Sequence, residues 1–299
     1  MQNWLLLALL APAVITIVNF IDKYVIEHKV KDYRGMPIYG AVVAIIAGTV
    51  IWIITGFQML PLLDALIVLF TGVLTMFGWV LYFNALSKSE TSYIIGLFQL
   101  IPIIALVLAF FLLGETITPI QLGGFAVVLV SVIGLSVKKE KQKFKFDKVF
   151  YLVVLSDVFF ALASVLIKFA ITANSFTKIL VFESWGLALG GLILFVGFPS
   201  VRHAFEKTTK TVGGKVLAIM LANEFIFIIS KVLTFLAISL GPVGLVSVLS
   251  GTQVFYGVIY GLILTLIFPK LFDEDKSIKV LSKKILLMVI LFAGILLMQ

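Results

Sequence analysis

The chain alternates between apolar runs of about 20 residues and short polar connections. A helix of that length crosses the hydrocarbon core of a bilayer, because each residue advances it by ~1.5 Å and the core is ~30 Å thick. No segment shows the roughly ten-residue alternation of outer-membrane strands. The pattern therefore predicts an all-α integral membrane protein with ten transmembrane helices, near residues 3–26, 37–56, 63–86, 92–113, 118–136, 149–171, 179–198, 214–239, 243–268 and 282–298.

Most connections between these spans are only a few residues long, for example GFQMLP and SKSET. Such short links lead us to expect that helices adjacent in sequence pack side by side. The basic segment VKKEKQKFKFDK lies at the midpoint of the chain. It divides a first five-helix unit, residues 1–137, from a second, residues 149–299, with 138–148 as a cytoplasmic linker. Its lysines are either simply solvated or in contact with anionic membrane lipid.

Composition agrees with a membrane protein. The chain is 62% hydrophobic and 13% charged, whereas a soluble domain carries about 25% charged residues. The net charge of +8 requires no nucleic acid as a partner, because the basic residues cluster between the apolar runs. The absence of cysteine excludes disulfides, thiolate metal sites and cysteine nucleophiles.

The sequence offers no basis for catalysis. Its only histidines, His28 and His203, lie far apart in predicted loops, and no metal-ligand cluster or phosphate-binding loop is present in the sequence. We therefore expect no enzyme activity, no cofactor and no metal. No ATPase domain is recognisable either, so any pumping would draw on an ion gradient or a partner.

The distribution of basic residues predicts the orientation. Nineteen of the Lys and Arg residues fall in the connections after the odd-numbered spans, and Lys178 alone falls on the opposite side. The positive-inside rule then places both termini outside the cytoplasm, in a multi-pass plasma (inner) membrane protein. The opening segment MQNWLLLALLAPAVITIVNF lacks a basic n-region, so we interpret it as a retained first span.

The two halves of the chain repeat each other weakly. FIDKYVI aligns with VLIKFAI, which pairs Lys23 with Lys168, and LYFNALS aligns with LTFLAIS. A two-residue slip then pairs Gln99 with Gln253. Because each half has five predicted spans, the second half has the opposite orientation. This inverted-repeat plan is typical of secondary transporters, whose substrate site lies between the halves.

The segment 82–135 resembles a known family. It contains a small-residue turn at Ala85, a helix with Pro102 inside, the pair Gly114-Glu115, and Gly123-Gly124 opening the last helix. In this order the features are similar to the EamA-type transporters of the drug/metabolite transporter superfamily. The resemblance implies ten helices around a central cavity lined mainly by helices 1, 3, 4, 6, 8 and 9.

The second half of the chain departs from the family pattern: it has FPKLFDED in place of Gly-Glu, and Tyr256 where Pro102 would align. Members of the family are usually described with cytoplasmic termini, whereas the distribution of basic residues predicts the reverse.

The eighth predicted span carries Asn223, Glu224 and Lys231 within ANEFIFIISKV. A charge at this depth costs roughly 2.5–3.5 kcal/mol, so these side chains should face the protein interior or water. The spacing of seven puts Glu224 and Lys231 within about 20° on one helical face. They either form structural pairs, such as Lys231 with Glu183, or present an acid and a base to a substrate. In the second case Glu224 would hold an ammonium group or a coupling proton, and Lys231 a carboxylate or phosphate.

The remaining candidates surround this face. Trp79, Tyr82, Gln99 and Gln253 are predicted to shape the substrate pocket. A gate or anion contact is predicted for Lys23, Lys168, Asn19 and Glu183. The alternative for the two lysines is that they snorkel to the interface. Asp157 lies at a depth similar to Glu224, and either a structural or a functional role fits it. Two small-residue patterns, Gly186-x-x-x-Gly190 and Gly257-x-x-x-Gly261, predict close helix packing.

Together these features predict a secondary transporter that works by alternating access. An acid and a base on one face favour a small polar metabolite, an amino acid or similar zwitterion, with export favoured by the family resemblance. The alternatives are an anionic substrate, such as a sugar phosphate or a lipid-linked sugar, and a membrane scaffold that transports nothing and uses its buried charges to fix helix register.

Overall fold

The computed structural model describes residues 3–30, 32–86, 97–98, 100–136, 148–267 and 278–298. These residues form helices and short connections, and no strand occurs among them. The elements are α1 (Asn3–His28), η1 (Tyr33–Gly35), α2 (Met36–Ile54), α3 (Leu62–Leu86), α5 (Leu100–Leu113), α6 (Pro119–Ser136), α7 (Lys148–Ala173), α8 (Phe176–Gly197), α9 (Pro199–Thr211), α10 (Gly214–Leu240), α11 (Val243–Ser250), α12 (Gln253–Ile267) and α13 (Ile278–Leu297).

The described helices confirm an all-α membrane architecture. Seven helical stretches are long and apolar enough to cross a membrane, and three shorter apolar helices accompany them at Leu100–Leu113, Pro119–Ser131 and Ile285–Leu297. Large apolar side chains such as Phe111 and Leu296 are exposed on the outside of the bundle, as expected where lipid replaces water. The count of ten spans and their division into two repeats stay predictions, and most of the linker 138–148 lies outside the described residues.

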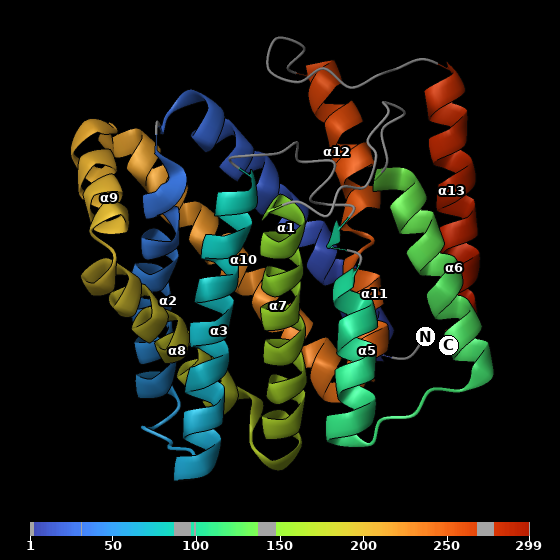
Figure 1. Ribbon diagram of the computed structural model, residues 1–299, viewed down its shortest axis with the longest axis horizontal. Helices are drawn as coiled ribbons and strands as arrows, with labels where there is room; N and C mark the ends of the chain where they lie inside the picture. Colours follow the sequence, from blue (N-terminus) through green and yellow to red (C-terminus); the bar gives the residue numbers. More distant parts are fainter. Residues whose placement is uncertain are drawn as a thin grey trace.

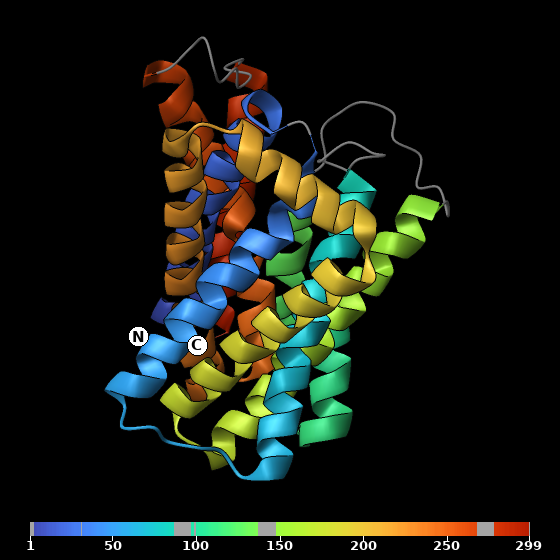
Figure 2. The same cartoon turned by 90° about the vertical axis from the view of Figure 1, so that its left-hand side faces the viewer.

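The helices pack across the two halves of the chain rather than along it. α1 packs on α10, α2 on α8, α3 on both α7 and α8, and α6 on α13, and these partners lie side by side in Figures 1 and 2. The expectation that neighbours in sequence pack side by side is wrong, because α2 and α3, or α7 and α8, touch only at a few positions. The apolar faces of each half are covered by the other half.

Two connections differ from their predicted form. The span predicted at 243–268 is broken into α11 and α12 by Gly251 and Thr252. The connection predicted at 199–213 contains the amphipathic helix α9, which buries Val201, Ala204 and Thr208 and leaves its basic residues exposed. Figure 2 shows α9 running obliquely across the upper end of the bundle.

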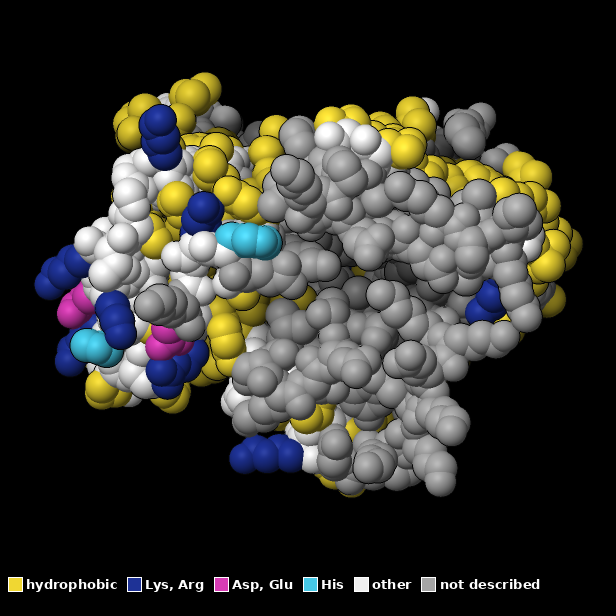
Figure 3. All heavy atoms as spheres, turned by 90° about the horizontal axis from the view of Figure 1, so that it is seen from above, with side chains coloured by type: hydrophobic (Ala, Val, Ile, Leu, Met, Phe, Trp, Pro, Cys, Tyr) yellow, Lys and Arg dark blue, Asp and Glu magenta, His cyan; other side chains and the backbone are white. Residues whose placement is uncertain are grey.

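Both ends of the described chain lie toward the same side of the bundle, away from the basic connections (Figures 1 and 2). α1 begins at Asn3 on that side and α13 returns to it at Leu297. Figure 3 looks onto the opposite face, where Lys and Arg side chains gather around α9. We call this opposite face the basic face and the side of the termini the terminal face. Which of them meets the cytoplasm stays a prediction.

Candidate functional site

A cavity of about 260 Å³ lies inside the bundle, between α1, α3, α7, α8, α10 and the α11–α12 break. We call it the larger cavity. Its size is near the lower end of small-molecule sites, which run from ~300 to ~1,000 Å³. Hydroxyl groups from four helices line it, on Thr71, Thr75, Ser164, Ser230, Thr234 and Ser250. Gln253 lies on the wall of the larger cavity, at the break between α11 and α12. The backbone carbonyl of Gln253 accepts a 3.4 Å hydrogen bond from the Thr16 hydroxyl.

An ion pair forms part of the wall of the larger cavity. Lys231 Nζ lies 2.6 Å from Glu183 Oε2 and also donates to Ser184 Oγ at 3.1 Å. All three side chains are almost completely buried. The pair joins α10 to α8, so the lysine expected on the substrate-facing side of its helix has a carboxylate partner in this conformation.

A second, smaller cavity of about 60 Å³ lies on the other side of Lys231, which borders both cavities. Two acids line it, Asp22 from α1 and Glu224 from α10. Asn223 Nδ2 donates to Asp22 Oδ1 at 2.8 Å, which fixes that carboxylate against α10. Glu224 Oε2 lies 3.0 Å from the point where a Cβ would stand on Gly40, so the missing side chain of α2 makes room for the acid.

Aromatic rings separate the two cavities. Phe227 borders both of them, and its ring centroid lies 5.8 Å from that of Trp79, which lines the smaller cavity. Trp79 also contacts Tyr82 and Phe160, with centroids 6.0 and 5.9 Å away. Aromatic pairs at these separations hold one another in defined orientations. Lys231 therefore lies beside aromatic rings, with Glu183 at the larger cavity and Glu224 at the smaller one.

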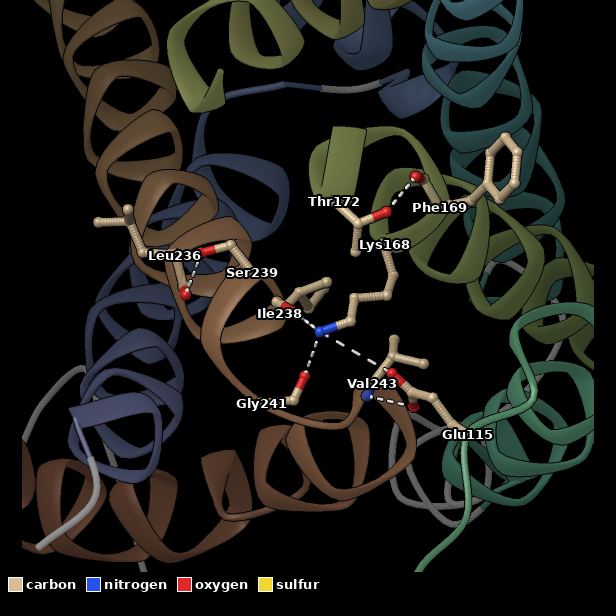
Figure 4. Close-up of polar contacts among 9 residues, drawn as sticks. All are labelled: Glu115, Lys168, Phe169, Thr172, Leu236, Ile238, Ser239, Gly241 and Val243. Carbon is tan, nitrogen blue, oxygen red and sulfur yellow. Dashed lines mark hydrogen bonds and ion pairs between the residues drawn. The ribbon is translucent and has the colours of Figure 1, made fainter. Parts of the chain in front are cut away.

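A polar network joins three elements near the terminal face (Figure 4). Lys168 of α7 donates to the carbonyls of Ile238 and Gly241 at 2.7 and 2.8 Å, where α10 ends. Its Nζ lies 3.8 Å from Glu115 Oε1, and Glu115 Oε2 accepts a 2.9 Å hydrogen bond from the backbone N–H of Val243, where α11 begins. The cation therefore meets a helix C-terminus and the anion a helix N-terminus, which are the favourable positions. We call these contacts the Glu115–Lys168 network.

Burial changes the pKa of Glu115. Glu115 stands in the connection between α5 and α6, and its side chain is only 17% exposed. Burial raises its pKa above the ordinary value of 4.5, against the opposing effects of the Val243 N–H and Lys168. The carboxylate therefore takes up a proton at a less acidic pH than an exposed glutamate would.

The residues predicted from the sequence divide between these places. Lys231, Glu183 and Gln253 line the larger cavity, and Glu224 and Trp79 line the smaller one. Asn223 supports Asp22, Tyr82 packs behind Trp79, and Lys168 joins the network with Glu115. Asn19 is exposed on α1 and lines neither cavity. Gln99 and the side chain of Lys23 lie outside the described residues.

Sequence reasoning missed Asp22 and the hydroxyl lining. Asp22 stands close to the end of the first apolar run, where a carboxylate is ordinarily interfacial. Only its contact with Asn223 places it at a cavity. Thr71, Thr75 and Ser164 could not be singled out from the sequence, because Ser and Thr are common small residues where membrane helices pack together. Within the described chain, no group of three or more His, Asp or Glu side chains is placed to hold a metal ion.

Comparison with known proteins supports this architecture. Residues 2–137 match the sequence model of the EamA-like transporter family, which confirms the resemblance drawn from the motifs of the first half. A protein of known crystal structure superposes with a TM-score of 0.72 over 99% of this chain and 98% of its own, at 15% sequence identity. At that identity the likeness establishes the fold alone. A search of curated proteins found no match.

Proposed function

We propose that this chain, whose residues 2–137 match the EamA-like transporter family, moves a small zwitterionic metabolite across the plasma membrane by alternating access. One observation carries the proposal. A buried lysine–glutamate pair borders a cavity of about 260 Å³ that is otherwise lined by hydroxyl, amide and apolar groups. A zwitterion such as an amino acid carries the two charges that match this pair.

Substrate recognition would exchange one ion pair for two. The carboxylate of the substrate takes the place of Glu183 at Lys231, and the freed Glu183 accepts the substrate ammonium. Each buried charge keeps a partner throughout, which avoids the large cost of an unpaired ion in the interior. The hydroxyls and Gln253 would bind the remaining polar atoms, and Phe227 would pack against the side chain of the substrate.

Alternating access requires that the two ends of the bundle open in turn. The Glu115–Lys168 network would close the terminal face in the present conformation, because it joins the first half of the chain to α7 and to the α10–α11 turn. The break between α11 and α12 gives the second half a point at which a helix can bend. Opening would separate Glu115 from Lys168 and expose the larger cavity to water.

The direction of transport and the orientation in the membrane are part of the same proposal. With the basic face in the cytoplasm, both termini lie outside, and the network closes the external end. Export is the direction we favour. Glu224, with Asp22 beside it in the smaller cavity, is the alternative acid for the substrate ammonium, or it holds a coupling proton.

Uptake into proteoliposomes tests this function. A panel of labelled amino acids and phosphorylated sugars is offered to the native protein, to Lys231→Met, Glu183→Gln and Glu224→Gln, and to Lys178→Met as a matched control, since Lys178 lines neither cavity. We expect uptake of a zwitterion that falls at least tenfold in Lys231→Met and in Glu183→Gln but not in Lys178→Met.

Other outcomes select the alternatives. Loss of sugar-phosphate uptake in Lys231→Met and in a further variant, Lys168→Met, with Glu183→Gln unaffected, would favour an anionic substrate. Absence of any uptake by a stable native protein would favour the scaffold, whose charges only fix helix register. Uptake that persists in both Lys231→Met and Glu183→Gln would contradict the assignment of the ion pair as the substrate site.

A further inference from the structure

Asp157 is an ionisable residue in the interior of the bundle. Its side chain on α7 is completely buried. Neither carboxylate oxygen has a hydrogen-bond partner within the described residues. Its neighbour Ser156, by contrast, donates to the carbonyl of Gly78 at 2.9 Å. A buried carboxylate without a partner is strongly unfavourable, which favours the neutral acid at Asp157.

Asp157 continues the face of α7 that lines the larger cavity. That face consists of Phe160, Ala163, Ser164 and Ile167, and Asp157 precedes Phe160 by three residues, which is one helical turn. Because α7 begins at Lys148 and runs from the basic face toward the terminal face, the acid lies one turn beyond the cavity wall on the side of the basic face.

Phe160 is the side chain at the end of this cavity-lining face. Its ring fills the space above Gly78, where a Cβ would stand 2.6 Å from ring carbon Cε1. It also contacts the rings of Trp79 and Phe98, with centroids 5.9 and 6.3 Å away. Movement of this one ring would extend the cavity to Asp157.

No described cation is placed to neutralise Asp157. α7 packs mainly against α3 and α5, and less against α8, α10 and α11. α5 and α11 carry no titratable side chain, and α3 offers Tyr82 near this level and Asp64 at its far end. On α8 and α10, Lys231 is bound to Glu183, while Lys178 and Lys215 stand at helix starts and Glu224 faces the smaller cavity.

We propose that Asp157 is the site of the coupling proton for transport. In the present conformation it holds the proton as a neutral acid. The bundle then changes conformation and Phe160 moves. The O–H bond of the Asp157 carboxyl group breaks, and the proton passes to water that enters from the larger cavity. The carboxylate then recovers a proton from the opposite side of the membrane before the cycle closes. This inference rests on the proposed transport function, makes the proton the coupling ion and assigns it to Asp157 in place of Glu224.

Two transport measurements, exchange and gradient-driven accumulation, distinguish a role in proton coupling from a role in substrate binding. Proteoliposomes containing native protein, Asp157→Asn or Asp64→Asn are supplied with a labelled mixture of the twenty amino acids. Exchange is measured at equal pH on both sides, and accumulation is measured under an imposed pH gradient. Asp64 is the matched control because it is another acid of the bundle but bonds to Asn174 at 2.8 Å and lines neither cavity.

We expect Asp157→Asn to exchange substrate within about twofold of the native rate, while its gradient-driven accumulation falls to the equilibrium ratio of one. Asp64→Asn should accumulate like the native protein. Gradient-driven accumulation by Asp157→Asn at the native level would overturn the proposal. Absence of exchange by the native protein would instead remove the transport function itself, so the two failures are distinguishable.

A second variant covers the case in which Asp157→Asn does not fold. Asp157→Glu keeps an ionisable group but lengthens the side chain by one carbon, toward Phe160 and the cavity. We expect it to retain accumulation with a pH profile displaced from that of the native protein. An unchanged pH profile would show that Asp157 is not the proton site and serves only to pack α7 against α3.

Discussion

At the scale of single residues, the Lys231–Glu183 pair is important for stability as well as for the proposed site. Replacing Lys231 by Met leaves Glu183 buried without its cation. Breaking one side of a buried pair costs roughly 3–5 kcal/mol, whereas replacing both partners by apolar groups is often neutral or stabilising. We expect Lys231→Met to lower the unfolding temperature of the purified protein, and Lys231→Met combined with Glu183→Leu to restore it while transport stays absent.

Ser184→Ala is the matched control for this pair. It removes only the 3.1 Å hydrogen bond from Lys231, and one such bond contributes about 1 kcal/mol. Its effect on thermal unfolding should therefore be much smaller than that of Lys231→Met. Equal unfolding temperatures for the native protein and Lys231→Met would mean that Glu183 finds another partner or a proton at no cost.

The sequence predicted which charges would lie inside but not all of their neighbours. Depth in an apolar run is enough to place Lys231 in the interior, because lipid excludes it. Its pairing with Glu183 was one of two open alternatives. The position of Asp22 beside Glu224 could not be read from the sequence, since it depends on how α1 is aligned along α10, and that alignment is set by packing between distant segments.

At the scale of helices, the contact between α3 and α8 depends on two glycines. A Cβ on Gly72 would lie 2.3 Å from the backbone nitrogen of Leu187, and one on Gly186 would lie 2.2 Å from the carbonyl oxygen of Leu69. Neither backbone can yield without separating the helices. We expect Gly186→Val to reduce the free energy of unfolding by about 3 kcal/mol, in the upper range for overpacking, as measured by chemical denaturation in detergent.

Gly123→Ala on α6 is the control for this substitution. No described atom lies within 4 Å of the Cβ that it adds, and alanine is the better helix former by about 1 kcal/mol. It should leave stability unchanged or raise it slightly. If Gly186→Val were as stable as Gly123→Ala, the close approach of α3 and α8 would not exist in the folded protein.

The structure confirms one of the two expectations drawn from this glycine pattern, and the other stays a prediction. Gly186 and Gly190 both pack closely, against Leu69 and Met76 of α3, whereas a Cβ on Gly257 would meet no described atom within 4 Å. Spacing shows that a helix can be approached closely, but the partner decides whether it is. The break between α11 and α12 and the helix α9 escaped detection for a related reason, because apolar content measures membrane compatibility and not the continuity of a helix.

At the scale of the whole molecule, the packing of the two halves against each other explains why the class of fold could be predicted from the sequence but the helix contacts could not. Apolar runs and the order of motifs were sufficient for a helical transporter architecture. The contacts of α1 with α10 and of α2 with α8 join residues more than one hundred positions apart, and those of α3 with α7 join residues more than sixty positions apart. No short-range pattern encodes such contacts. The Glu115–Lys168 network likewise joins segments more than fifty positions apart.

The Glu115–Lys168 network should make the terminal face sensitive to pH. The carboxylate of Glu115 must be ionised to attract Lys168, and burial raises its pKa above the ordinary value. As pH falls through that raised pKa, the charge is lost and the closed conformation loses its ion pair; as pH rises above it, the pair is restored. Acidification at this face should therefore favour opening, and Glu115→Gln should behave like the acidified protein at every pH.

Accessibility of the larger cavity measures this opening. Because the chain contains no cysteine, Ser164→Cys provides a single thiol on the cavity wall. Its rate of reaction with a membrane-impermeant thiol reagent is compared with and without Glu115→Gln over a range of pH. The ratio of the two rates cancels the ionisation of the thiol itself. We expect Glu115→Gln to react severalfold faster near neutral pH, with the two rates converging as the solution becomes acidic. A ratio of one at all pH values would show that Glu115 contributes nothing to closure, and that Lys168 serves only to cap the end of α10.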